Sequence, residues 1–262
     1  MPRFEPFDWY DQALYYDIVF DADTSREAHF LQAAQKRYAL TRGTRLLEPA
    51  CGSGRLVAAM ARRGYRVIGF DISDGILRFA RQRLRDDGLT ARLFHARMEH
   101  FHLPPNAFDL AHCLVSTFKY LLDESAARAH LKRMVRVLKP GGIYALGLHL
   151  TDYTDPTASH ERWVASRGDI HVTCNIHGWP PDRRRRLERV RSRLTVRDHG
   201  RERRFETTWH FRTYNLRELK SLLRSVPAFE HLATYSFHCD INAPVPFDGN
   251  QLDTILILRR RP

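Results

Sequence analysis

Residues 46–60 constrain the fold of this chain most, because a short apolar run turns directly into an apolar helical run through two glycines. Gly52 and Gly54 permit a tight turn and let a ligand approach the main chain without hindrance from a Cβ atom. The amides at the start of the following helix would point toward that ligand. The segment therefore predicts a strand, a glycine loop and a helix that together bind part of a nucleotide.

The glycine pattern alone leaves open a dinucleotide, a phosphate or another nucleotide. The dinucleotide fingerprint needs a third glycine three residues after Gly54, where this chain has Val57. Beyond the helix, a second apolar run ends in Asp71, a position from which a carboxylate accepts both hydroxyl groups of a ribose. Apolar runs at 108–115 and 143–148 follow, separated by a helical stretch. This alternation predicts repeated βα units and an α/β fold.

Five motifs in this order resemble those of the class I S-adenosylmethionine-dependent methyltransferases, specifically the branch that acts on small molecules. The motifs are residues 48–55, Asp71, residues 96–98, residues 108–110 with 117–121, and residues 138–142. The resemblance covers about residues 46–148. It implies a Rossmann-like sheet of seven strands flanked by helices, with one strand reversed. It also implies that the protein binds S-adenosylmethionine, transfers its methyl group and releases S-adenosylhomocysteine.

The resemblance also assigns a cofactor site. Glu48 and the glycine loop would hold the methionine portion, Asp71 the ribose, and Ile72 would pack against the adenine. The cofactor-binding residues that it implies are Tyr16, Glu48, Ala50, Cys51, Gly52, Gly54, Asp71, Ile72, Met98, Glu99, Leu114 and Ser116. Two alternatives stay open, since Tyr16 could instead be packed in the core and Asp71 could instead cap a helix.

One position departs from the family pattern. The family places Gly-Asp-Met where this chain has Ala96-Arg97-Met98, and that aspartate would accept a hydrogen bond from the adenine amino group. Arginine has no acceptor. Either Glu99 or a water takes this place, or Arg97 points away and Met98 supplies only main-chain and packing contacts.

Methyl transfer from a sulfonium is an in-line displacement, so holding donor and acceptor at attack distance can supply up to about 7–11 kcal/mol of the catalysis. No covalent residue is required. His149 follows the fifth core strand, at the sheet edge where α/β folds bind ligands, and is the best candidate general base. Tyr120 and Tyr153 are alternatives that could orient an acceptor by hydrogen bonding. Phe118 and Trp163 could wall the acceptor pocket.

The remaining segments are expected to complete the fold. Residues 1–40 form an N-terminal helical cap, residues 41–150 the S-adenosylmethionine-binding core, and residues 214–262 a C-terminal helix and strands that complete the core sheet. Between them, apolar and polar residues alternate from 169 to 212, which predicts a three-stranded antiparallel meander. This meander follows the fifth core strand, where the resemblance implies a lid that covers the substrate, so residues 151–213 are assigned to an inserted β lid.

The chain has 42 Lys and Arg against 30 Asp and Glu, and its net charge of +12 would favour a polyanion or an acidic substrate. Residues 183–186 are four arginines, expected on an exposed loop of the meander. Glu202 and Glu206 on the next strand would neutralise part of this basic face by cross-strand pairing. An RNA or protein methyltransferase that docks its substrate on the meander is therefore the alternative function. A non-catalytic cofactor-binding protein is a third, suggested by Arg97.

The four cysteines are far apart, and His100 and His102 have no third ligand nearby in sequence, so neither a disulfide scaffold nor a metal site is predicted. No apolar stretch approaches the roughly 18 residues of a membrane span, and residues 1–10 lack the basic and apolar character of a leader. We therefore expect a cytoplasmic protein, without a membrane partner, that acts on a small-molecule methyl acceptor.

Overall fold

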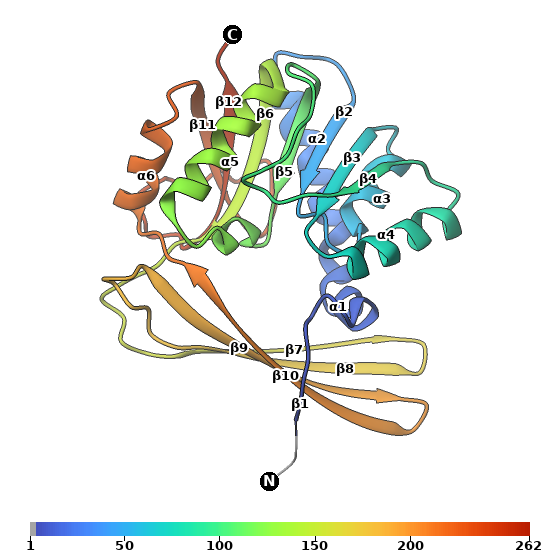
Figure 1. The fold of residues 1–262 in the computed structure, drawn as a ribbon. Coiled ribbons are helices and arrows are strands. Elements are labelled where there is room, and N and C mark those ends of the chain that lie inside the picture. The colour runs from blue at the N-terminus through green and yellow to red at the C-terminus, as the bar shows by residue number, and fades with distance from the viewer. Residues whose placement is uncertain (1–3) are drawn as a thin grey trace.

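Two β-sheets frame the structure, a computed structural model that describes residues 4–262 (Figure 1). The core sheet has the strand order β11-β12-β6-β5-β2-β3-β4, and the second sheet has the order β1-β10-β9-β8-β7. The first three residues of the predicted 1–40 cap lie outside the described residues. In Figure 1 the second sheet lies across the end of the core sheet at which β2 leads into the glycine loop.

The core sheet is parallel apart from one strand. Its members are β2 (Arg45–Pro49), β3 (Arg66–Asp71), β4 (Arg92–His95), β5 (Phe108–Cys113), β6 (Leu138–His149), β11 (Phe229–Ser236) and β12 (Asp253–Arg260). β12 runs antiparallel to both of its neighbours, β6 and β11. The predicted seven-stranded sheet with one reversed strand is therefore confirmed.

Helices cover both faces of the core sheet (Figure 1). α5 (Glu124–Val137) and α6 (Leu216–Arg224) pack on one face, and α2 (Thr24–Tyr38), α3 (Arg55–Arg62) and α4 (Asp74–Asp86) pack on the other. Each large apolar side chain that these helices bury contributes about 1.5–3 kcal/mol. Three of these helices begin at side chains that accept from a main-chain amide, since Ser73 caps α4, Asp123 caps α5 and Asn215 caps α6.

The second sheet comprises β1 (Glu5–Pro6), β7 (Ser159–Arg167), β8 (Ile170–Gly178), β9 (Leu187–Asp198) and β10 (Arg201–Arg212). The predicted meander corresponds to β8, β9 and β10. The sequence did not reveal β7, because its apolar residues 163–165 are consecutive rather than alternating and most of the strand is exposed. One face of the sheet packs against α1 (Ala13–Phe20) through buried residues that include Ile18, Val172 and Leu194.

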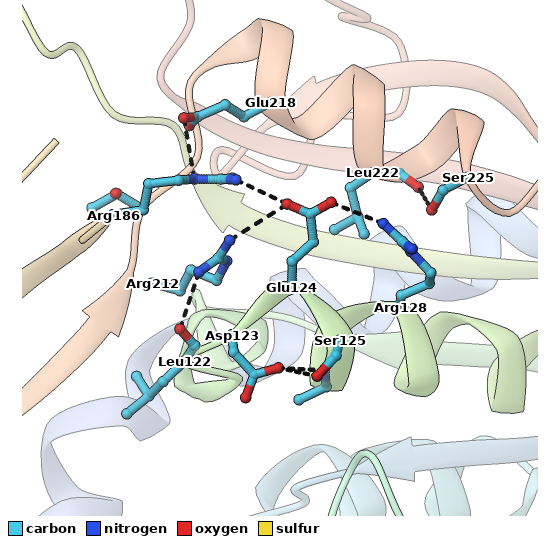
Figure 2. Close-up of polar contacts among 12 residues, drawn as sticks. Leu122, Asp123, Glu124, Ser125, Arg128, Arg186, Arg212, Glu218, Leu222 and Ser225 are labelled. Carbon is cyan, nitrogen blue, oxygen red and sulfur yellow. Dashed lines mark hydrogen bonds and ion pairs between the residues drawn. The ribbon is translucent and has the colours of Figure 1, made fainter. Parts of the chain in front are cut away.

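Ion pairs attach the second sheet to the core near the start of β9 and the end of β10. Figure 2 shows Glu124, the first residue of α5, between Arg128, Arg186 and Arg212. Arg186 also pairs with Glu218 of α6 at 3.1 Å. The prediction of an exposed arginine loop is therefore wrong for Arg186, which is half-buried because these two carboxylates draw it toward the core.

A second attachment is a buried ion pair. Lys119 lies in the short 3-10 helix η2 (Thr117–Tyr120) and donates to Glu188 of β9 at 2.7 Å. Its side chain is only 2% exposed, and its ammonium group lies 5.2 Å from the ring centroid of Phe211 in β10. Lys119 therefore links η2, which follows the core strand β5, to β9 and β10 of the second sheet.

The neighbouring strands β9 and β10 of the second sheet carry the expected cross-strand charge pairs. Arg193 lies opposite Glu206 and contacts it at 2.5 Å, and Arg197 lies opposite Glu202 and contacts it at 3.0 Å. The predicted partial neutralisation of the basic face is confirmed. None of the helices in residues 4–262 combines the length and the apolar character that a bilayer crossing needs.

Candidate functional site

The glycine loop joins β2 to α3 at the carboxyl edge of the core sheet. Ala50, Gly52 and Gly54 have φ angles of 51°, 55° and 72°, in the left-handed region that favours glycine. A Cβ atom on Gly54 would lie 2.9 Å from the Cβ of Ala80 in α4. The sharp turn and this close approach explain why the sequence places glycine there.

A cavity lies over this loop. It is lined by Tyr16, Phe20, Glu48, Pro49, Ala50, Cys51, Gly52, Ser53, Arg55, Leu56, Cys113, Leu114, Val115 and Thr117. Six of the predicted cofactor residues are among them: Tyr16, Glu48, Ala50, Cys51, Gly52 and Leu114. The structure thus brings the N-terminal segment, the glycine loop and the end of β5 together around one space.

Asp71 ties the glycine loop to the end of β3. One carboxylate oxygen accepts from the amide of Gly52 and the other from the amide of Ser73, both at 3.0 Å. Burial raises the pKa of Asp71, although these main-chain hydrogen bonds oppose the shift. The alternative that Asp71 caps α4 is wrong, because the Ser73 hydroxyl accepts from the amide of Ile76 at that helix start. Each oxygen of Asp71 retains a lone pair for a further donor.

Glu48 is a buried carboxyl group with an unused oxygen. It precedes the last residue of β2, is 7% exposed, and its Oε2 has no hydrogen-bond partner among the described residues. Burial raises its pKa well above the usual range, against an opposing effect of Arg55. A basic group, the Nε2 of His112 in β5, lies 3.6 Å from this oxygen. A histidine in the middle of an apolar strand could have identified His112 as a candidate from the sequence, but this feature was not used.

Aromatic residues of the N-terminal segment close one side of the cavity. Tyr16 packs against Phe20, with ring centroids 4.6 Å apart, and a Cβ atom at Gly52 would lie 3.5 Å from its hydroxyl oxygen. Tyr16 is therefore packed among aromatic residues and also lines the cavity, while its contact with the cofactor stays a prediction. Tyr120 of η2 contacts Tyr10 and Phe211. Burial raises the pKa of Tyr120 to about 12, so at neutral pH its phenol can donate a hydrogen bond.

The region expected to hold an adenine ring has an open apolar surface. Ile72, directly after β3, is 49% exposed. Arg97 lies outward and pairs with Glu99 at 2.6 Å, which is one of the three arrangements considered for the departure from Gly-Asp-Met. Burial alone would raise the pKa of Glu99, but the hydrogen bond from Arg97 lowers it. Met98 is buried, and its carbonyl accepts from His130 Nδ1 at 3.0 Å.

His149 lies beside the cavity at the end of β6. Its amide donates to the hydroxyl of Ser116 at 3.0 Å, and the neighbours of Ser116, Val115 and Thr117, line the cavity. Its Nδ1 donates to Asp253 Oδ1 at 2.8 Å, which fixes the imidazole and leaves Nε2 free to accept a proton. Asp253 was not found from the sequence, because it begins a strand 104 residues later in the chain.

Two predicted residues lie elsewhere. The Tyr153 hydroxyl donates to Glu218 at 3.2 Å and lies 2.7 Å from the Thr213 hydroxyl, at the base of the second sheet. It is thus engaged in that attachment rather than in the cavity. Phe118 is fully buried in the core against His130 and Tyr214, so the expectation that it walls an acceptor pocket is wrong.

Asp17 of α1 joins the cavity to the second sheet. This fully buried carboxylate accepts from the hydroxyl of Ser53 in the glycine loop at 2.6 Å and from Arg83 of α4. Arg167, the last residue of β7, also pairs with it at 2.8 Å. Three segments far apart in the sequence therefore meet at one side chain.

Residues 46–142 match the family model of a methyltransferase domain. A protein of Geobacillus sp. (strain WCH70) that carries a methyltransferase name is 29% identical over 143 residues, which is 55% of this chain and 56% of that protein. The ubiquinone/menaquinone biosynthesis C-methyltransferase UbiE of Yersinia pestis (strain Pestoides F) is 37% identical over 106 residues, 38% of this chain and 41% of UbiE. The chain thus spans about half the length of these curated relatives.

Solved structures share the fold over nearly the whole chain. An S-adenosylmethionine-dependent methyltransferase from Clostridium acetobutylicum ATCC 824 superposes with a TM-score of 0.76 at 19% identity, covering 95% of this chain and 98% of that one. CalS10, an amino pentose methyltransferase from Micromonospora echinaspora solved with S-adenosylmethionine bound, gives a TM-score of 0.65 at 20% identity and covers 97% and 92%. The second sheet is therefore part of a known arrangement. Residues 46–142 are therefore a methyltransferase domain, and the chain as a whole has the fold of class I S-adenosylmethionine-dependent methyltransferases.

Proposed function

We propose that this protein transfers a methyl group from S-adenosylmethionine to a nitrogen or oxygen atom of a small molecule. The observation that carries the proposal is the pair of carboxyl groups at adjacent strand ends, Glu48 with an unused buried oxygen and Asp71 bound to the glycine loop. An amino acid end and a ribose are the two polar parts of this cofactor, and each needs such an acceptor. The cofactor seen in CalS10 supports the same assignment.

The residues present fit the cofactor. Glu48 and the loop amides would hold the methionine end, Asp71 the ribose hydroxyls, and the exposed Ile72 with Met98 the adenine ring. Bound S-adenosylmethionine supplies an electrophilic methyl group on a sulfonium, and S-adenosylhomocysteine is the product. The chain itself needs to orient the acceptor, exclude water and take up one proton.

We assign the proton to His149. Its Nδ1 is held by Asp253, so Nε2 can accept a proton from an acceptor that is bound next to the cavity over the glycine loop. Trp163 of β7 lies near this cavity, because its ring centroid is 5.3 Å from that of Phe20, which lines it. Tyr120 is proposed to orient the acceptor as a hydrogen-bond donor. The division into a cap (1–40), core (41–150), lid (151–213) and C-terminal segment (214–262) is part of this proposal.

The charges around His149 favour an acceptor with a basic amine. Glu161, two residues before Trp163 on the same face of β7, is exposed at its surface, but partial desolvation and the nearby charge of Asp253 raise its pKa, against an opposing effect of His149. Two carboxyl groups thus converge on one imidazole in a chain whose net charge is +12. CalS10 is named as an amino pentose methyltransferase, which is in line with this choice, whereas UbiE is named as a C-methyltransferase.

A macromolecular acceptor has less support. Arg193 and Arg197 are paired with acidic residues across the strands, and Arg186 with carboxylates of the core. This pairing reduces the positive charge that a nucleic acid would need. The cytoplasmic location stays a prediction.

Calorimetric titration with S-adenosylmethionine tests the cofactor assignment. We expect saturable one-to-one binding, and S-adenosylhomocysteine should compete for the same site. A folded protein that binds neither compound would overturn the proposed function. A screen of small amines, with S-adenosylhomocysteine production as the readout, then identifies the acceptor.

The His149→Ala variant should turn over an accepted amine about a hundredfold to ten-thousandfold more slowly, the usual contribution of a general base. Its affinity for S-adenosylmethionine should stay within about twofold of wild type, because His149 does not line the cofactor cavity. The kcat and the calorimetric Kd are the two measurements. His238→Ala, which removes an exposed imidazole elsewhere, is the control. Full activity of His149→Ala would exclude this residue as the base.

A further inference from the structure

Two buried polar side chains face each other beneath the glycine loop. His112 is 1% exposed, and neither of its ring nitrogens has a hydrogen-bond partner within residues 4–262. The Oε2 of Glu48, equally without a partner there, lies 3.6 Å from His112 Nε2. β2 and β5 are parallel neighbours in register, with Leu46 beside Leu110, so the sheet itself sets Glu48 beside His112. The pairing of β2 with β5 thus places two side chains that lack hydrogen-bond partners, Glu48 and His112, next to each other.

The surroundings give Glu48 no free cation within the described part of the chain. The titratable and charged groups that face it are His112 and Cys113 from β5, Arg55 from α3, Glu27 from α2, Cys51 and Asp71 from the loop and β3, and Tyr16 from α1. Arg55 is the sole permanent cation in this set, and it is bound to Glu27. An ionised Glu48 would therefore be a buried charge without its own partner, which costs several kcal/mol.

The ionisation tendencies agree with the geometry. Burial raises the pKa of Glu48 well above its usual range, while Arg55 opposes the shift. Burial, together with Arg55, lowers the pKa of His112 to about 3, so the imidazole is neutral. One proton is then left for the pair, and it resides on the carboxyl group, from which it can be donated to the imidazole.

We propose that Glu48 is a neutral carboxylic acid in the free protein and that it ionises when the ammonium group of the cofactor binds, releasing one proton to the solvent. The proposal rests on the proposed function, because the ammonium group belongs to the cofactor. The O–H bond of the carboxyl breaks, the proton leaves to water, and the carboxylate pairs with the ammonium. His112 is a positioning residue: a small shift from the present 3.6 Å would let its Nε2 accept from the acid and, as its other tautomer, donate to the carboxylate.

The pH dependence follows from the two states. The bound cation lowers the pKa of Glu48 relative to that of the free protein. Between these two pKa values binding releases a proton, and affinity rises with pH by up to about tenfold per unit. Below the bound-state pKa the group is protonated in both states, and above the free-state pKa it is ionised in both, so the linkage vanishes at either side.

Calorimetry in two buffers of different ionisation enthalpy measures the released protons directly. The ligand is S-adenosylhomocysteine, which keeps the amino acid end, and the pH is 6 to 7, below the range of about 7.7–8.0 in which an α-amino group titrates. We expect about one proton released by wild type, none by Glu48→Gln, and an unchanged value for Glu230→Gln, a surface carboxyl paired with Arg259. Binding without proton release by wild type would overturn this inference alone, whereas no binding at any pH would overturn the proposed function as well.

A second measurement uses the wild-type protein and so does not depend on how a variant folds. The infrared carbonyl band of a protonated carboxyl should disappear when S-adenosylhomocysteine is added, and Glu48→Gln assigns the band. The His112→Leu variant should shift the linkage to higher pH and weaken binding several-fold at pH 6.5, with recovery at higher pH. A merely structural role for His112 would weaken binding equally at every pH, and a carbonyl band that persists in the complex would contradict ionisation of Glu48.

Discussion

The Asp71→Ala variant is expected to bind S-adenosylmethionine roughly ten- to a hundredfold more weakly than wild type. The substitution removes the proposed acceptor for the ribose hydroxyls, and a hydrogen bond to a charged group contributes about 1.5–3 kcal/mol. It also frees the amides of Gly52 and Ser73, which Asp71 holds at 3.0 Å, so the glycine loop loses its link to β3. Calorimetric titration gives the Kd.

Two further variants separate these contributions. Asp71→Asn keeps the shape but offers one acceptor oxygen instead of two, so an intermediate affinity is expected. Asp74→Ala removes a carboxylate three residues later, in the first turn of α4, and should leave the Kd close to that of wild type. An unchanged affinity in a correctly folded Asp71→Ala protein would remove Asp71 from the cofactor site.

The Glu188→Ala variant should lower the free energy of unfolding by about 3–5 kcal/mol, the usual cost of leaving a buried charge without its partner. The large cost comes from Lys119, because its ammonium group is buried and Glu188, at 2.7 Å, is the carboxylate that neutralises it. The contact with the Phe211 ring remains but is weaker than the ion pair. Denaturant titration measures the change.

The second sheet supplies a matched control. Glu202→Ala breaks an ion pair with Arg197 of similar length, 3.0 Å, in which the arginine is 72% exposed, and a second one with Arg204; it should lower the free energy of unfolding far less than Glu188→Ala. The double variant Lys119→Met, Glu188→Ala should regain much of the lost stability, since no unpaired charge is left. Equal effects of Glu188→Ala and Glu202→Ala would show that burial of Lys119 does not set the strength of this attachment.

The parts of the fold that were predicted depend on local patterns. Neighbouring residues define the glycine loop, the acid after the next strand and the alternation of the meander. The core sheet and the strands β8, β9 and β10 could therefore be predicted. β7 could not, because its consecutive apolar residues 163–165 lack the period of a strand. A helix or strand can thus be predicted from its local sequence where one of its faces is buried and the other is exposed.

The site depends on contacts between distant residues, which a single sequence does not reveal. His112 meets Glu48 only because β5 lies beside β2, and Asp253 meets His149 only because β12 returns antiparallel to β6. The same holds for Arg186, whose place is decided by carboxylates of α5 and α6. The glycine loop together with the motifs that follow it predicted the cofactor, whereas the neighbours that shift the pKa values of these residues could be found only from the tertiary structure.

Asp17 limits how the second sheet of this protein can be exchanged. Under the proposed division, residues 151–213 with β7 to β10 form the lid over the acceptor, so acceptor preference would be transferred by exchanging this segment with that of a methyltransferase. Such a chimera would also exchange Arg167, and with it one of the cations that compensate the buried Asp17 beside Ser53. Without a basic side chain at that position, the carboxylate of Asp17 would keep Arg83 as its cation, and the position of Ser53 in the glycine loop would be disturbed. Arginine or lysine at position 167 should therefore accompany any transplanted segment.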